Sequence, residues 1–134
     1  GGRAGSVERA PVMPPAGTVT AIMHDTSDLD GAIAFWTEVL GLDVLHRDER
    51  YVYLSPMSDG GPHLAFQLVP EAKTGKNRLH LDIRVPDRAA FTTRVVGLGG
   101  AVVGEHQEGD YPAWTVMRDP GGNEFCIYEA VHPS

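Results

Sequence analysis

The stretch DLDGAIAFWTEVLGLDVL, residues 28–45, predicts a helix that leads into a strand. The second half of the chain repeats this order of predicted elements. Asp28 suits the N-cap of a helix, because its carboxylate can accept a hydrogen bond from a free N–H of the first turn. Apolar side chains then recur at spacings of four, three and four residues up to Leu40, which places them on one helix face. Gly41 follows where a helix often ends in left-handed backbone. A capped amphipathic helix is therefore expected over residues 29–40.

Strand patterns surround this helix on both sides. A β-rich segment precedes it, and three short apolar segments follow, the last two separated by the turn cluster MSDGG at residues 57–61. The expected strands are residues 18–25, 42–45, 51–55 and 63–69. The first half of the chain therefore predicts one β-α-β-β-β unit.

The second half repeats this order at a constant offset. Asp87, which opens the second helix, follows Asp28 by 87 − 28 = 59 residues, and Gly100 follows Gly41 by the same number. The expected strands of this half are residues 78–85, 101–104, 113–118 and 124–129, with a helix between Pro86-Asp87 and Gly99-Gly100. The agreement of strand, cap, helix and stop at one offset indicates a duplicated unit.

The duplication predicts an α+β fold. We expect two tandem βαβββ modules, at about 18–70 and 77–130, to form a half-open mixed sheet around a central cleft, with the helices on the outside. Together they make one domain over residues 18–134. Residues 1–17, rich in Gly, Pro and Ala, are expected to be a tail or linker.

Composition narrows the classes of partner. The chain has 134 residues, a net charge of −7 and scattered cations, so nucleic-acid binding is not expected. It has no apolar run of membrane-helix length and no signal-like start, which favours a cytoplasmic protein without a membrane partner. Cys126 is the single cysteine, so an internal disulfide and a CxxC metal knuckle are both excluded.

Strand alternation predicts which side chains face the cleft. If Leu79, Leu81 and Ile83 pack against a helix, His80 and Asp82 face the other way. The same rule, applied to the related strands, selects further positions, and two aromatic residues there can either stack on a planar ligand or complete the core. The predicted ligand pocket consists of Ala21, Met23, Tyr53, Gln67, His80, Asp82, Trp114, Cys126 and Tyr128.

Three stretches together resemble the vicinal oxygen chelate superfamily, which includes glyoxalase I, extradiol dioxygenases, fosfomycin-modifying enzymes and bleomycin-resistance proteins. They are residues 28–45, RLHLDIRV at 78–85 and WTVMRDPGGNEFCIYE at 114–129. The NEFC ending at residues 123–126 is similar to that of a glyoxalase-like subgroup. The resemblance implies the cleft fold and a small-molecule ligand.

The resemblance also implies four metal-ligand positions, which fall on Ala21, Gln67, His80 and Cys126. Only His80 matches the family pattern. Ala21 has no donor atom, and Cys126 is a soft ligand that acts as a thiolate. A divalent metal is therefore possible but not favoured; if one is bound, His80, Gln67 and Cys126 are its expected ligands.

We therefore expect a metal-poor protein that binds or sequesters an aromatic or hydrophobic metabolite or drug. Two alternatives stay open: a metal-dependent lyase, isomerase or dioxygenase, and a metal-free acid/base enzyme, each with His80 as the best candidate catalytic residue. The resemblance further implies a homodimer. Because the connection at residues 70–77 is short, the two modules are expected to pack within one chain.

Overall fold

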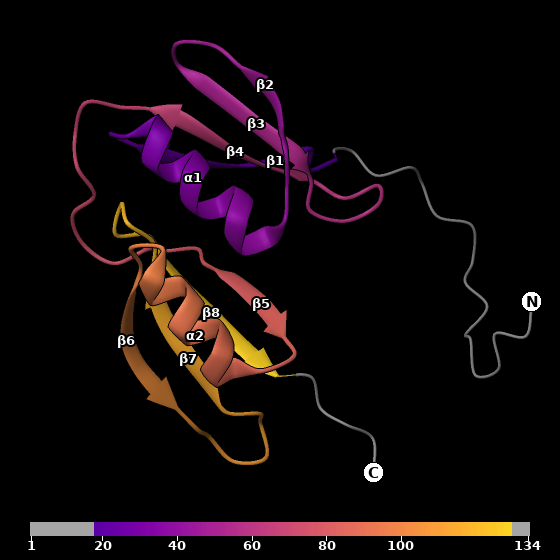
Figure 1. Ribbon diagram of the computed structural model, residues 1–134, viewed down its shortest axis with the longest axis vertical. Helices are drawn as coiled ribbons and strands as arrows, with labels where there is room; N and C mark the ends of the chain where they lie inside the picture. The colour runs from indigo at the N-terminus through magenta and orange to yellow at the C-terminus, as the bar shows by residue number, and fades with distance from the viewer. Residues whose placement is uncertain (1–17, 130–134) are drawn as a thin grey trace, which may run out of the picture.

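The computed structural model describes residues 18–129, so the expected tail at residues 1–17 lies outside the described part. It contains two βαβββ modules joined by an irregular connection (Figure 1). The first module consists of β1 (Ala21–Thr26), α1 (Leu29–Leu40), β2 (Val44–Arg47), β3 (Tyr51–Pro56) and β4 (His63–Leu68). The second consists of β5 (Leu81–Val85), α2 (Arg88–Gly97), β6 (Ala101–His106), β7 (Trp114–Arg118) and β8 (Glu124–Glu129).

Both modules have the same sheet topology. The strand order is β1-β4-β3-β2 in one sheet and β5-β8-β7-β6 in the other. In each sheet the first strand runs parallel to the last, while the remaining pairs are antiparallel. The α+β fold of two duplicated modules is therefore confirmed.

The helices begin after the capping residues Asp28 and Asp87, which occupy equivalent positions in the two repeats. The Asp28 side chain accepts a hydrogen bond from the backbone N–H of Gly31, and the Asp87 side chain accepts one from Ala90. Gly41 ends α1 with a φ of 65°, a conformation that a residue without a Cβ adopts at little cost.

The eight strands form two four-stranded mixed sheets, one in each module. Strand β5 begins later than predicted. The β5–β8 register pairs Leu81 with Phe125, so Leu79 would need Asn123 as its neighbour. The Asn123 backbone is instead used by the turn that closes the β7–β8 hairpin, through both its N–H and its carbonyl. The prediction that Leu79 packs inward is therefore wrong, and its surface is 86% exposed.

Helix α1 packs against both modules. It covers its own sheet at β3 and β4, and its Trp36 ring lies 5.0 Å, centroid to centroid, from that of Phe125 in β8. Phe35 approaches the same phenylalanine at 6.1 Å. The Glu38 carboxylate accepts a hydrogen bond of 2.8 Å from Arg94 of α2. In Figure 1, α1 accordingly lies between its own sheet and the second module. One hydrophobic core therefore spans both halves of the duplication.

A buried polar contact fixes this packing. The indole N–H of Trp36, whose surface is 0% exposed, donates a 2.9 Å hydrogen bond to the Asp119 carboxylate in the β7–β8 turn. Asp119 also accepts a hydrogen bond from the backbone N–H of Asn123. Asp119 is 6% exposed, so the protein must supply the hydrogen bonds that water would otherwise make to its carboxylate. This contact joins residues 83 positions apart and orients the second module on α1.

Neither of the two described helices is long and apolar enough to cross a membrane.

Replacing Trp36 with Phe should lower the free energy of unfolding by about 2 kcal/mol, because a buried acceptor loses its donor. Denaturant unfolding followed by circular dichroism measures the change. The matched control is Trp114→Phe, since Trp114 is only half-buried and its indole makes no side-chain hydrogen bond among the described residues. Equal destabilisation by the two variants would show that the hydrogen bond to Asp119 is not responsible.

Candidate functional site

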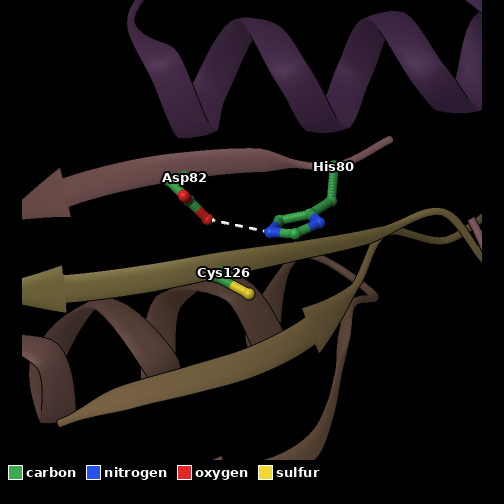
Figure 2. Close-up of side chains that lie close together, drawn as sticks. All are labelled: His80, Asp82 and Cys126. Atoms are coloured by element: carbon green, nitrogen blue, oxygen red, sulfur yellow. Dashed lines mark ion pairs between the residues drawn. The ribbon is translucent and has the colours of Figure 1, made fainter. Parts of the chain in front are cut away.

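Three chemically active side chains meet on the sheet of the second module. His80, immediately before β5, and Asp82 within it lie two residues apart, so they project from the same face. The β5–β8 register places Cys126 beside Asp82. The Nε2 atom of His80 lies 3.1 Å from Oδ1 of Asp82, and one potential ligand atom from each of the three side chains lies within 4.8 Å of the others. Figure 2 shows the three side chains and the ion pair between His80 and Asp82.

The helix side of the same sheet is occupied by core residues. Phe125 and Ile127, the neighbours of Cys126 in β8, are buried. Because successive side chains of a strand alternate between faces, Cys126 points to the side opposite that core. The cluster is consequently accessible: Cys126 is half-buried, while the side chains of His80 and Asp82 are 50% and 64% exposed.

The cluster borders a cavity of about 670 Å³ that is lined only by residues of the second module and the connection before it. This volume falls in the range of small-molecule sites. Its lining side chains His80 and Asp82 come from the β5 edge of the sheet, whereas Val103, Trp114 and Val116 come from β6 and β7 towards the other edge. The lining residues are Lys76, Asn77, His80, Asp82, Val103, His106, Tyr111, Pro112, Trp114, Val116, Glu124, Cys126 and Tyr128.

Aromatic rings form one wall of this cavity. His106 and Trp114 face each other across the β6–β7 register, and their rings stack with centroids 5.4 Å apart and an interplanar angle of 21°. Tyr128 neighbours Trp114 across the β7–β8 register. A flat aromatic surface of this kind favours planar, apolar ligands.

Burial, hydrogen bonding and charge set the protonation of Cys126 and Glu124, which both line this cavity. Burial raises the pKa of the Cys126 thiol, and the nearby carboxylates of Asp82 and Glu124 raise it further. The pKa of Glu124 is lowered, mainly by the hydrogen bond that its carboxylate accepts from the backbone N–H of Asn77. At neutral pH the free protein therefore presents a neutral Cys126 thiol and an ionised Glu124 carboxylate.

A second cavity, of about 930 Å³, lies where β1, the connection and the β7–β8 turn meet. His24 lines it, with its ring edge-on to those of Trp36 and Phe66. Burial lowers the pKa of His24, and no described residue offers its Nδ1 atom a hydrogen bond. A neutral His24 fits this environment, because burial penalises the charged imidazolium.

The predicted pocket residues divide between the modules. His80, Asp82, Trp114, Cys126 and Tyr128 line the cavity of the second module. The remaining four positions belong to the first module. They are Ala21, Met23, Tyr53 and Gln67, of which Met23 lines the second cavity. On the first module Tyr53 lies near His46 and His63, and Gln67 donates a long hydrogen bond to the Tyr51 hydroxyl.

Sequence reasoning missed His106, Tyr111 and Pro112. The expected strand at residues 101–104 ends before His106, whereas β6 continues through His106 and pairs with β7. The available signal was the β-rich sequence AVVGEH opposite Trp114. Tyr111 and Pro112 belong to the loop that follows β6. The sequence of this loop has no periodic pattern from which the direction of a side chain could be predicted.

The four positions that the resemblance implies for a metal do not form a complete ligand set. Ala21 has no donor, Gln67 lies in the other module, and only His80 and Cys126 come together. The carboxylate that joins them is that of Asp82, two residues after His80. The donors present are therefore one imidazole, one carboxylate and one thiol, all on one module.

Comparison with known protein families establishes the family of this chain. The family described as glyoxalase-like domain matches residues 21–128, nearly all of the described chain. The chain belongs to this family. No curated protein matches at a significant level.

Solved structures with the same fold come from several members of the glyoxalase/bleomycin resistance/dioxygenase superfamily. A glyoxalase-related enzyme from Fulvimarina pelagi is 20% identical with a TM-score of 0.67, covering 84% of this chain and 88% of its own. Lactoylglutathione lyase from Agrobacterium tumefaciens is 22% identical with a TM-score of 0.62, covering 88% and 96%. A fosfomycin resistance protein from Listeria monocytogenes, bound to manganese(II) and dihydroxypropylphosphonic acid, is 12% identical with a TM-score of 0.72, covering 86% and 90%. At these identities the likeness concerns the fold.

Proposed function

We propose that this glyoxalase-like protein binds or sequesters a small aromatic or hydrophobic molecule in the cavity of its second module. The observation that carries the proposal is the stacked His106–Trp114 pair at the wall of a 670 Å³ cavity. A planar ligand that covers these rings removes apolar surface from water and gains ring–ring contact. The polar cluster on the opposite side gives such a ligand a fixed orientation.

The residues that line the cavity favour binding of a ligand that stays chemically unchanged. This binding needs no metal at the four positions that the family resemblance implies. Those positions do not supply a complete ligand set, whereas Val103, Pro112 and Val116 line the cavity together with the aromatic pair. Binding therefore depends on surface complementarity, which a metabolite or a drug with a flat ring system satisfies.

A second candidate function is supported by the His80–Asp82 ion pair of 3.1 Å. A histidine oriented by a carboxylate and open to a cavity has the geometry of a general base. In this reading the chain is a metal-free acid/base enzyme, and the cavity holds its substrate. Mass spectrometry of each bound compound after incubation distinguishes the two candidates, because sequestration returns the compound unchanged.

We also propose that the protein forms a homodimer. Strands β1 and β5 each pair with a single strand among the described residues, which leaves one edge of each open. Beside these edges Val19, Met23 and Leu79 are exposed. Open strand edges with apolar side chains next to them favour association with another chain, and a second copy supplies both edges at once.

A panel of planar aromatic compounds should raise the melting temperature and quench tryptophan fluorescence, measured with excess chelator present. For compounds that bind, Trp114→Ala should weaken affinity by about tenfold. This change corresponds to about 1.4 kcal/mol, the free energy expected for a lost aromatic contact. The control is Val96→Ala, an exposed position on α2 that does not line the cavity. Unchanged affinity in Trp114→Ala, or equal loss in both variants, would contradict this assignment.

Sedimentation velocity should show a dimer for the unmodified chain and a shift towards monomer for Leu79→Arg, which places a charge beside the open edge of β5. The matched control is Leu45→Arg, since Leu45 is also exposed but lies in β2, at the other edge of its sheet. A monomer for the unmodified chain at micromolar concentration would refute the proposal.

A further inference from the structure

We propose that the cavity where β1, the connection and the β7–β8 turn meet binds a small organic cation of the guanidinium class. This cavity of about 930 Å³, which we call the junction cavity, is lined by residues 22–28, 71–74, 77–81 and 119–121, with contributions from α1 and β4. The aromatic ligand proposed above belongs to the other cavity, so this second site does not depend on it.

Two buried polar atoms beside the junction cavity lack a hydrogen-bond partner. They are Nδ1 of His24 and Oδ1 of Asn77, and both residues line the cavity. Buried polar atoms in folded proteins nearly always have a partner, so two exceptions at one cavity indicate that a bound molecule completes them. The amide oxygen of Asn77 can only accept a hydrogen bond, which calls for a ligand that carries N–H donors.

The environment of His24 holds its ring in the form that can accept a hydrogen bond. Burial lowers the pKa of His24 and outweighs the opposite effect of the Asp119 and Asp25 carboxylates. The ring lies edge-on to those of Trp36 and Phe66, with centroids 5.9 and 5.8 Å away. A neutral imidazole keeps a lone pair on one ring nitrogen. His24 therefore offers an acceptor and supplies no positive charge to the carboxylate of Asp119.

Asp119 is a buried carboxylate without a cationic partner. It is 6% exposed and accepts hydrogen bonds from the indole of Trp36 and the backbone N–H of Asn123. No lysine, arginine or histidine of residues 18–129 forms an ion pair with it. Buried carboxylates are usually paired with a cation, and Asp119 lines the junction cavity. A cationic ligand there supplies the missing charge.

The remaining charges of the lining favour a cation over an anion. Acidic residues outnumber basic ones by four to two, with Asp25, Asp28, Glu71 and Asp119 against Lys73 and Arg78. The charge of Lys73 is partly used elsewhere, because its Nζ lies 3.8 Å from the Glu124 carboxylate. Ile22, Phe66 and Val69 add apolar surface that suits a short alkyl chain.

The arrangement of the acceptors distinguishes a guanidinium from a simple ammonium ion. His24 comes from β1, Asn77 from the connection and Asp119 from the β7–β8 turn, so the acceptors approach from three separate segments. A planar guanidinium holds its N–H donors in a fixed fork and can reach several acceptors at once. The structure therefore favours an alkylguanidinium, with its alkyl chain on the apolar part of the lining.

Butylguanidinium is a suitable probe for the full chain, with butylurea as a neutral analogue of the same shape. Calorimetry should show one equivalent of butylguanidinium bound, and butylurea should bind at least about tenfold more weakly, because hydrogen bonds to a charged donor are stronger. Backbone amide NMR should show the largest changes in β1 and residues 71–78. The indole N–H signal of Trp36, identified with Trp114→Phe, should also shift, since it reports on Asp119.

Variants of the two residues with unpartnered atoms test the acceptors. His24→Phe keeps a ring beside Trp36 and Phe66 but removes the acceptor, and Asn77→Leu removes the amide oxygen. Each should weaken butylguanidinium binding by about tenfold, the loss expected for one hydrogen bond to a charged group. Unchanged affinity in both variants would overturn the assignment.

Three exposed positions test the charge without altering the core. Asp25→Asn should weaken binding by about threefold, and Arg78→Gln should strengthen it by about threefold, because it removes a like charge from the lining. A variant that merely damages the fold would not gain affinity. The matched control is Asp59→Asn, which changes the net charge as Asp25→Asn does but lies in the β3–β4 turn, outside the cavity.

Three results would overturn the site: no binding of butylguanidinium at millimolar concentration, equal affinity for butylurea, or equal weakening by Asp25→Asn and Asp59→Asn. The last would indicate general attraction of cations to an acidic chain. The comparison of the two probes on the unmodified chain needs no variant to fold. Because neither probe contains an aromatic ring, these results do not bear on ligand binding at the stacked His106 and Trp114 rings.

Discussion

The hydrogen bond from Trp36 to Asp119 is the contact on which the arrangement of the two modules depends. It is buried, it joins α1 to a turn of the other sheet, and a carboxylate without it would be left short of a donor in the core. The Trp36 and Phe35 rings pack on Phe125 around it. By placing α1 against the helix side of the second sheet, this packing leaves the opposite face, with Cys126, open to solvent. The cavity is therefore a consequence of how the modules are joined.

The duplication supplied two equivalent sheets that have since acquired different chemistry. At the position of His80 the first module carries Ala21, and at the position of Cys126 it carries Gln67, following the offset of 59 residues (80 − 21 and 126 − 67). The second module alone thus combines imidazole, carboxylate and thiol. A fold that can build a site from both halves has, in this chain, concentrated its reactive groups in one. The aromatic wall is formed by the same module.

Much of the fold could be predicted from local signals. The caps at Asp28 and Asp87 and the stop at Gly41 determined the helices, because each depends on a few neighbouring residues. Alternation along β5 and β8 placed His80, Asp82 and Cys126 on one face for the same reason. The start of β5 could not be predicted, since it depends on the use of Asn123 by a turn. The relation of the two sheets and the inclusion of His106 also escaped prediction, because both depend on contacts between distant segments.

The central claim is that the functional site lies on the second module. Backbone amide NMR of the protein, titrated with the planar aromatic compound that gives the largest thermal shift, tests it most directly. The account predicts that the largest chemical-shift changes lie in β6, β7 and β8 and in the loop at residues 107–112, beside Trp114 and His106. Changes concentrated instead in β1, β3 and β4, or around the cavity that His24 lines, would contradict it.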